Sequence, residues 1–267
     1  MGHYKILFLD IDGTILRPDD TIEDSTKTAI IEMKRQEIEV VLATGRPLHE
    51  ISELAEELQI ASFIGYNGAL GIYEGETIFA EPMQPEDVKY ILDVAAAHGH
   101  EVVCYTHEKN YLTSLESESV QAFLKQFHLR QNAIFTEGVI EKILGMTVIT
   151  AGKNGDSLYE FKNGIHFSQV NVEGMQHCHD VIRDHVNKGI GVEFLLKKLR
   201  IKREESIAFG DGMNDREMLE SAGEGFAMGN AHPDLFQYAK HKTTAFTDSG
   251  IYNGLKSLGL LSNKPVT

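Results

Sequence analysis

The chain has 267 residues, which is enough for one large domain or two moderate ones whose cores need no covalent staples. Its 40 acidic residues outnumber its 25 lysines and arginines, and the net charge of -15 disfavours nucleic acid or an anionic membrane surface as partner. Only Cys104 and Cys178 are present, and no apolar run approaches the roughly 18 residues that span a bilayer. We therefore expect a cytoplasmic protein without a disulfide framework.

The first 80 residues alternate between apolar runs and amphipathic segments, which predict strands and helices respectively. The predicted strands span residues 4–9, 38–43 and 62–66, and the predicted helices span 26–36 and 47–58. Pro47 suits the first turn of the second helix. Residues 69–79 predict a hairpin that turns at Glu74-Gly75. Strand and helix in alternation indicate a parallel, doubly wound sheet with right-handed crossovers.

A second unit begins where Pro82 and Pro85 interrupt the pattern. Its predicted elements are helices at 86–98 and 119–127, strands at 101–106 and 145–150, and a hairpin at 165–182. The first pattern then resumes with a helix at 191–199, strands at 206–209 and 225–228, helices ending near 222 and 240, and a C-terminal segment at 250–258. We therefore predict an α/β core of residues 1–82 and 188–267, interrupted by an α+β domain of residues 83–187.

Polar side chains follow three predicted strands of the core, at the points where those strands end. Asp10 and Asp12 follow the first strand, Thr44 and Gly45 follow the second, and a run from Gly210 to Asp215 follows a later one. The carboxyl ends of parallel strands meet at one edge of a sheet, where ligands bind in open α/β folds. Residues about 200 positions apart in sequence are thus expected to converge.

Asp10 and Asp12 are two nearby carboxylates that repel each other. Both stay ionised only if a cation lies between them, and otherwise one takes a raised pKa and can act as an acid. The first case predicts bound magnesium, which prefers hard oxygen ligands; Asp10, Asp211, the Asp12 carbonyl, a phosphate oxygen and waters would supply them. Lys188, which opens the helix leading back into the core, provides a local cation for an anionic substrate.

These residue types suit phosphoryl transfer, in which charge must be neutralised and the reacting groups held in line. Asp10 can attack phosphorus as a nucleophile, and Asp12 can protonate the leaving oxygen and then activate water. Asp215 can hold a metal-bound water or orient Lys188. The predicted phosphate contacts are Thr44, Gly45, Lys188 and Asn214. Arg46 either reaches substrate or pairs with a surface acid, and Asn67 either touches substrate or satisfies a tight turn.

The ordered motifs resemble those of the haloacid dehalogenase superfamily. They are Asp10-Ile-Asp-Gly-Thr, Ala43-Thr-Gly-Arg, Lys188 and Gly210-Asp-Gly-Met-Asn-Asp. The inserted domain, Asn67-Gly68-Ala69 and Ala227-Met-Gly-Asn-Ala231 are similar to the Cof-type, class IIB branch. The resemblance covers essentially the whole chain. It implies a Rossmann-like core, a mobile α+β cap, dependence on Mg²⁺, and hydrolysis of small phosphorylated metabolites.

The resemblance also implies roles for particular residues. Asp10 matches the nucleophile and Asp12 the acid/base; Thr44, Lys188 and Asn214 match the phosphate contacts, and Asp211 and Asp215 match the acidic metal cluster. We expect a monomer or small homo-oligomer that acts on a sugar phosphate or cofactor phosphate. A phosphomutase is the nearest alternative, and a non-catalytic protein that binds a phosphorylated metabolite is a second one.

Overall fold

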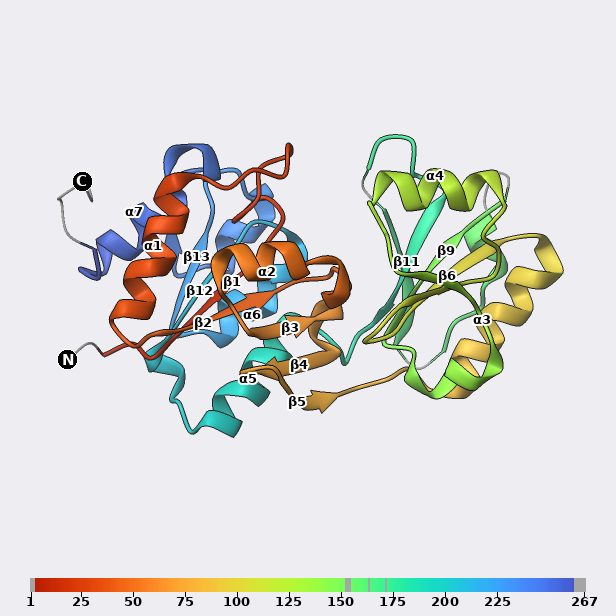
Figure 1. The fold of residues 1–267 in the computed structure, drawn as a ribbon, viewed down its shortest axis with the longest axis horizontal. Coiled ribbons are helices and arrows are strands. Elements are labelled where there is room, and N and C mark those ends of the chain that lie inside the picture. The colour runs from red at the N-terminus through yellow and green to blue at the C-terminus, as the bar shows by residue number, and fades with distance from the viewer. Residues whose placement is uncertain (1–2, 152–154, 163, 171, 262–267) are drawn as a thin grey trace. The chain divides into compact units, whose positions relative to one another are not determined.

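The computed structural model describes residues 3–151, 155–162, 164–170 and 172–261 (Figure 1). The chain divides into two compact units, each with its own sheet. The first unit comprises residues 1–45, 54–79 and 187–267, and the second comprises 46–53 and 80–186. Residues 1–2 and 262–267, which the predicted core includes, lie outside the described residues.

The first unit is built on a mixed sheet of eight strands. In sheet order they are β14 (His241–Lys242), β13 (Glu224–Ala227), β12 (Ser206–Gly210), β1 (Ile6–Leu9), β2 (Glu39–Ala43), β3 (Ser62–Gly65), β4 (Leu70–Tyr73) and β5 (Glu76–Ala80). The strands from β14 to β3 are parallel, and β4 runs antiparallel to β3. The four residues of β1 have no exposed surface, which explains a continuous apolar run instead of alternation.

Helices cover both faces of this sheet. They are α1 (Asp24–Arg35), α2 (Ser52–Leu58), α5 (Lys188–Leu199), α6 (Arg216–Ser221) and α7 (Gly250–Ser257). Ile6 and Phe8 of β1 share a core with α5 and α6, as Val192 and Met218 show. Because successive strand residues point to opposite faces, Leu7 and Leu9 face the other layer, and α1 packs against α7. The doubly wound α/β fold class predicted from the sequence is confirmed.

The second unit has a six-stranded sheet and two longer helices. Its strands, in sheet order, are β10 (Ile165–Gln169), β11 (Cys178–Arg183), β9 (Gly145–Ile149), β6 (Glu101–Tyr105), β7 (Asn110–Leu112) and β8 (Asn132–Ile134). Val102 and Cys104 pack with α3 (Pro85–His98), whereas Val103 packs with α4 (Glu118–Gln126). The helices therefore cover opposite faces of β6, since its side chains alternate.

The predictions of two helices from the sequence are wrong in part. Residues 47–58 were expected to form one helix, but Leu48–Glu50 is a 3-10 turn and α2 begins at Ser52. The side chains of His49 and Glu50 bind Asn110 of β7, and this tertiary contact outweighs local helix propensity.

The predicted helix ending near residue 240 is instead a 3-10 helix, Pro233–Gln237, followed by β14. Pairing of His241 and Lys242 with β13 draws the chain into the sheet before a longer helix can form. Strands β7, β8 and β14 were not predicted, because two or three residues are too few to show alternation.

Asp180→Asn is expected to stabilise the protein at neutral pH. Burial raises the pKa of Asp180, although Thr147 donates a 2.6 Å hydrogen bond to its Oδ1. A carboxyl whose pKa is higher in the folded than in the unfolded chain stabilises the fold at low pH, and this contribution is lost as the pH rises. The gain from asparagine in unfolding free energy should therefore grow between about pH 4 and pH 8, as measured by urea denaturation. Asp93→Asn, on the exposed side of α3, is the control; an equal trend there would contradict the prediction.

Candidate active site

The predicted site residues of three strands meet at the carboxyl edge of the first unit's sheet. Asp10 follows β1, Thr44 follows β2 and Asp211 follows β12, and β1 lies between the other two strands. In register, Leu9 pairs with Leu42 on one side and Phe209 on the other, so the three strands end together. The parallel topology therefore places these polar groups side by side.

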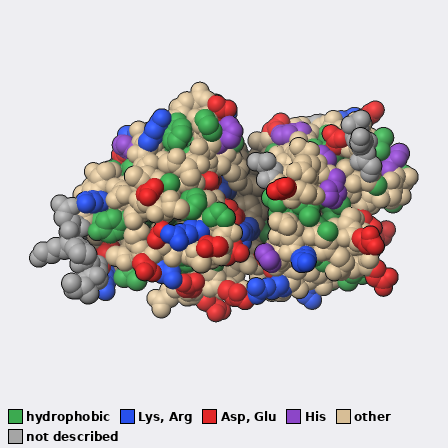
Figure 2. Space-filling model, turned by 90° about the horizontal axis from the view of Figure 1, so that it is seen from above, with side chains coloured by type: hydrophobic (Ala, Val, Ile, Leu, Met, Phe, Trp, Pro, Cys, Tyr) green, Lys and Arg blue, Asp and Glu red, His purple; other side chains and the backbone are tan. Residues whose placement is uncertain are grey.

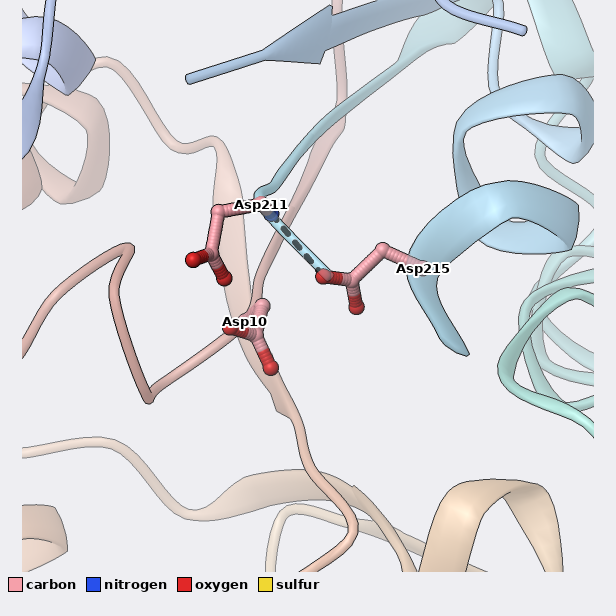
Figure 3. Close-up of side chains that lie close together, drawn as sticks. All are labelled: Asp10, Asp211 and Asp215. Atoms are coloured by element: carbon pink, nitrogen blue, oxygen red, sulfur yellow. Dashed lines mark hydrogen bonds between the residues drawn. The ribbon is translucent and has the colours of Figure 1, made fainter. Parts of the chain in front are cut away.

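Asp10, Asp211 and Asp215 form one acidic cluster, in which one carboxylate oxygen from each residue lies within 4.8 Å of those from the other two (Figure 3). Asp10 and Asp215 are buried, and Asp211 is partly exposed. Oδ2 of Asp215 accepts hydrogen bonds from the backbone N–H groups of Asp211 at 2.9 Å and Gly212 at 3.0 Å. Asp215 thus holds the loop that carries Asp211.

Gly13 lets the loop after β1 approach this cluster. Its φ is 77°, and a Cβ at this position would lie 2.2 Å from Oδ2 of Asp211. Any larger residue would overlap that carboxylate and strain the backbone. The glycine that the sequence places after Asp12 is therefore needed both for the turn and for the close approach of two loops.

Lys188 is fully buried against two of the acids. Its Nζ donates to Oδ1 of Asp10 and to Oδ1 of Asp215, each at 2.6 Å. Asn187 caps the helix that Lys188 begins, since its side chain accepts a 3.0 Å hydrogen bond from the N–H of Ile190. Burial by itself would lower the pKa of Lys188, but Asp10 and Asp215 outweigh it and raise the pKa. Lys188 is therefore a permanent cation at neutral pH.

One lysine does not balance three carboxylates. Burial and the charge of Asp215 raise the pKa of Asp10 well above its usual range, although Lys188 opposes this. Burial, Asp215 and, to a smaller extent, Asp12 raise the pKa of Asp211 to about 7. A second cation would relieve this repulsion, and a hard divalent ion suits an all-oxygen donor set. The chemistry of the cluster therefore fits Mg²⁺.

The remaining predicted residues of this unit lie around the same edge. Asp12 is exposed and close enough to Asp211 to influence its pKa. Thr44 is buried, and its backbone N–H donates to the carbonyl of Ile64 at 2.8 Å. Asn214 is exposed, as is Gly45, and both lie against Asn67.

Arg46 belongs to the second unit, unlike the other predicted site residues. The short segment 46–53 is held there by Glu50, whose Oε1 accepts hydrogen bonds from Asn110 Nδ2 at 2.8 Å and from the Arg130 N–H at 2.9 Å. The chain passes from the first unit to the second directly after Gly45. Contact of Arg46 with substrate stays a prediction.

Asn230 is a site residue to which sequence reasoning assigned no role. Its Nδ2 donates to the carbonyl of Gly13 at 2.8 Å and to Oδ2 of Asp211 at 3.3 Å, while its Oδ1 accepts from the N–H of Phe246 at 3.1 Å. It therefore ties together three loops beside the acidic cluster. Its position just beyond β13, at the same edge of the sheet, was the available signal.

Charged side chains of both signs lie on the face of the molecule drawn in Figure 2. On the face in Figure 2, lysines and arginines are interspersed with acidic side chains and form no extended basic patch. The acidic cluster of Asp10, Asp211 and Asp215 is the one group of three or more potential metal ligands found in the described part of the chain. Among these residues, too, no helix has both the length and the apolar character to cross a membrane.

Comparison with known proteins places this arrangement in a family. The sequence profile of haloacid dehalogenase-like hydrolases matches residues 7–255. YkrA of Bacillus subtilis (strain 168), whose name describes it provisionally as a phosphatase, is 31% identical over 260 residues, covering 96% of this chain and 98% of YkrA. The HMP-PP phosphatase of Cronobacter sakazakii (strain ATCC BAA-894) is 28% identical over 247 residues, covering 87% and 86%.

A solved structure has the same fold. The HAD subclass IIB sugar phosphatase BT4131 superposes with a TM-score of 0.80 at 25% identity, covering 96% of this chain and all of that one. These two relatives and this structural neighbour thus carry phosphatase names. The match of the family profile to nearly the whole chain, with the acidic cluster and Lys188 at the expected edge of the sheet, shows that this chain belongs to the haloacid dehalogenase-like hydrolases.

Proposed function

We propose that this chain is a magnesium-dependent phosphatase that hydrolyses small phosphorylated metabolites through an aspartyl-phosphate on Asp10. The observation that carries the proposal is the arrangement of Asp10, which the buried Lys188 holds by one oxygen within an acidic cluster. The relatives named above as phosphatases of HMP-PP and of sugars make a cofactor phosphate or a sugar phosphate the favoured substrate class. Residues 83–187 would form the cap, and 1–82 with 188–267 the catalytic core.

Asp10 is suited to attack phosphorus. Lys188 binds its Oδ1, while no described residue donates a hydrogen bond to its Oδ2, which is left to act as the nucleophile. As the bond from Oδ2 to phosphorus forms, the bond from phosphorus to the leaving oxygen breaks, and Asp12 gives that oxygen a proton. Asp12 then accepts a proton from the water that attacks phosphorus. The bond from phosphorus to Oδ2 of Asp10 breaks in this step, which releases orthophosphate and restores the Asp10 carboxylate.

The surrounding residues balance and orient the phosphoryl group. Lys188 offsets negative charge beside Asp10. Thr44, the Gly45 amide and Asn214, on neighbouring loops, are proposed to donate hydrogen bonds to the phosphoryl oxygens. When bound by Asp10, Asp211, Asp215 and the Asp12 carbonyl, Mg²⁺ would neutralise further charge on the phosphoryl oxygens. Arg46 is proposed to contact the remainder of the substrate.

A phosphomutase would need a second phosphate site, and two arginines of the second unit that could bind phosphate already have partners within the protein. Arg130 pairs with Glu53, and Arg183 is buried and donates to the carbonyl of Leu144 at 2.9 Å. These guanidinium groups are engaged within the protein. Hydrolysis is therefore favoured over transfer of phosphate within a sugar.

Purified protein is expected to release orthophosphate from phosphorylated metabolites only when Mg²⁺ is present. Removal of the metal with EDTA should lower the rate by at least roughly 100-fold, and added Mg²⁺ should restore it. Asp211→Asn removes one proposed ligand and should raise the Mg²⁺ concentration for half-maximal rate by roughly tenfold. Metal-independent release would contradict the role of the cluster, and isomerised substrate without free phosphate would favour the mutase.

The partners, location and oligomeric state expected from the sequence are compatible with this function. The negative net charge disfavours a nucleic acid or an anionic membrane as partner, and the proposed partner is a small phosphorylated substrate. A cytoplasmic location and a monomeric or small homo-oligomeric state stay predictions from the sequence.

A further inference from the structure

The turn after β3 has an unusual backbone. Tyr66, Asn67 and Gly68 all have positive φ values, of 53°, 52° and 104°. Glycine adopts such angles readily and asparagine tolerates them, but a buried tyrosine rarely does. Two successive non-glycine residues in this region indicate that tertiary contacts impose the conformation, and such outliers are concentrated at functional sites.

The turn contacts two of the loops that carry predicted phosphate-binding residues. The N–H of Asn67 donates to the carbonyl of Thr44 at 3.0 Å. On the other side, a Cβ at Gly68 would lie 2.1 Å from the carbonyl oxygen of Asn187, so the turn packs directly on the residue that precedes Lys188. The turn therefore fixes the end of β2 relative to the start of α5.

The side chain of Asn67 reaches a third loop. Its Oδ1 accepts a 3.1 Å hydrogen bond from Nδ2 of Asn214. Its carboxamide also lies against Gly45, where a Cβ would stand 3.0 Å from the same oxygen. One N–H of the Asn214 amide is thus committed to Asn67, which sets the direction of the second N–H.

We propose that Asn67 is a positioning residue for phosphate binding: it orients the Asn214 amide and spaces it from Gly45. The inference rests on the proposed function, because it assigns these two groups to the phosphoryl site. Asn67 acts through Asn214 and does not itself need to touch the substrate. A turn-forming role alone would require the left-handed backbone of Asn67 but not its carboxamide.

A double-mutant cycle separates these roles. Asn67→Gly deletes the carboxamide and keeps a residue that accepts positive φ, Asn214→Ala deletes the oriented group, and the double variant combines them. Gln59→Gly is the matched control, since Gln59 has φ 53° but an exposed side chain at the end of α2. The measurements are KM and kcat with 4-nitrophenyl phosphate and Mg²⁺, affinity for orthophosphate by calorimetry, and the melting temperature.

Asn67→Gly and Asn214→Ala should each raise KM and the orthophosphate Kd by roughly tenfold, with smaller changes in kcat. The KM and orthophosphate Kd of the double variant should be no higher than those of the weaker-binding single variant, because Asn67 has nothing to orient once the Asn214 amide is gone. Asn67→Gly and Gln59→Gly should change the melting temperature by the same amount. Wild-type affinity in Asn67→Gly, or equal losses in both backgrounds, would overturn the inference.

The failure of this inference is distinguishable from failure of the proposed function. If the wild-type protein hydrolyses phosphate esters and Asn67→Gly has the same KM and orthophosphate Kd, the proposed function stands and the inference about Asn67 is wrong. If the wild-type protein binds orthophosphate but turns over no substrate, the proposed function is wrong, and the double-mutant cycle measured by calorimetry still tests the role of Asn67. Absence of both binding and turnover in the wild type would overturn both.

Discussion

Asp10→Asn is expected to lower Mg²⁺-dependent phosphate release by on the order of 10⁴-fold or more, as found when an essential nucleophile is removed. An amide oxygen carries no negative charge and does not attack phosphorus under these conditions. The fold should survive, because Lys188 keeps its 2.6 Å ion pair with Asp215 and the acidic cluster loses one repelling charge. The measurements are kcat for orthophosphate release and the melting temperature.

Asp12→Asn is the matched comparison, because it alters a carboxyl two residues away with a different proposed role. With 4-nitrophenyl phosphate, the leaving phenolate needs little protonation, so attack by Asp10 should proceed while the later water attack lacks its base. Asp12→Asn should then show a burst of nitrophenolate near one equivalent, followed by slow turnover. Asp10→Asn should show no burst. An equal burst in both variants, or full activity in Asp10→Asn, would show that another group attacks phosphorus.

Lys188→Met is expected to remove activity and to destabilise the protein. The variant loses the cation beside the nucleophile, for which we expect a fall in kcat of roughly 10³-fold. It also leaves Asp10 and Asp215 buried without their shared partner, at a cost of about 3 kcal/mol in unfolding free energy. Protonation relieves that repulsion, so the loss should be larger near pH 8 than near pH 5.5. Urea denaturation at the two pH values measures it.

Two further variants control for the change from lysine to methionine. Lys198→Met, on the exposed side of the same helix, should alter the unfolding free energy by no more than about 0.5 kcal/mol. Adding Asp215→Asn to Lys188→Met removes one of the unpaired charges and should recover part of the stability without recovering activity. A Lys188→Met protein as stable as wild type at both pH values would contradict the paired role of Lys188.

Much of the core and its site could be predicted because the relevant signals are local. Buried parallel strands appear as continuous apolar runs, and the polar residues that follow each run mark the carboxyl edge of the sheet. Asp10, Thr44 and Asp211 were located in this way. The sequence also predicted a turn at Gly13, but the close approach of Gly13 to Asp211 could not be predicted from it.

The features that escaped prediction depend on contacts between distant segments. Residues 48–50 leave the helical path because His49 and Glu50 bind Asn110, about 60 positions away. Strand β14 replaces the end of a helix because it can pair with β13. Local propensity is a weak preference that such contacts override.

The sequence by itself determined the family, the α/β class and the chemical groups available at one edge of the sheet, because these follow from hydrophobic pattern, strand ends and motif order. Only the tertiary structure decided which groups pair: Lys188 with Asp10 and Asp215, Asn230 with Asp211, and Asn67 with Asn214. The partners Lys188 and Asp10 are 178 positions apart, and Asn67 and Asn214 are 147 apart. Hydrogen bonds require agreement within a few tenths of an ångström, and that precision comes from packed helices and from left-handed turns that no local pattern encodes.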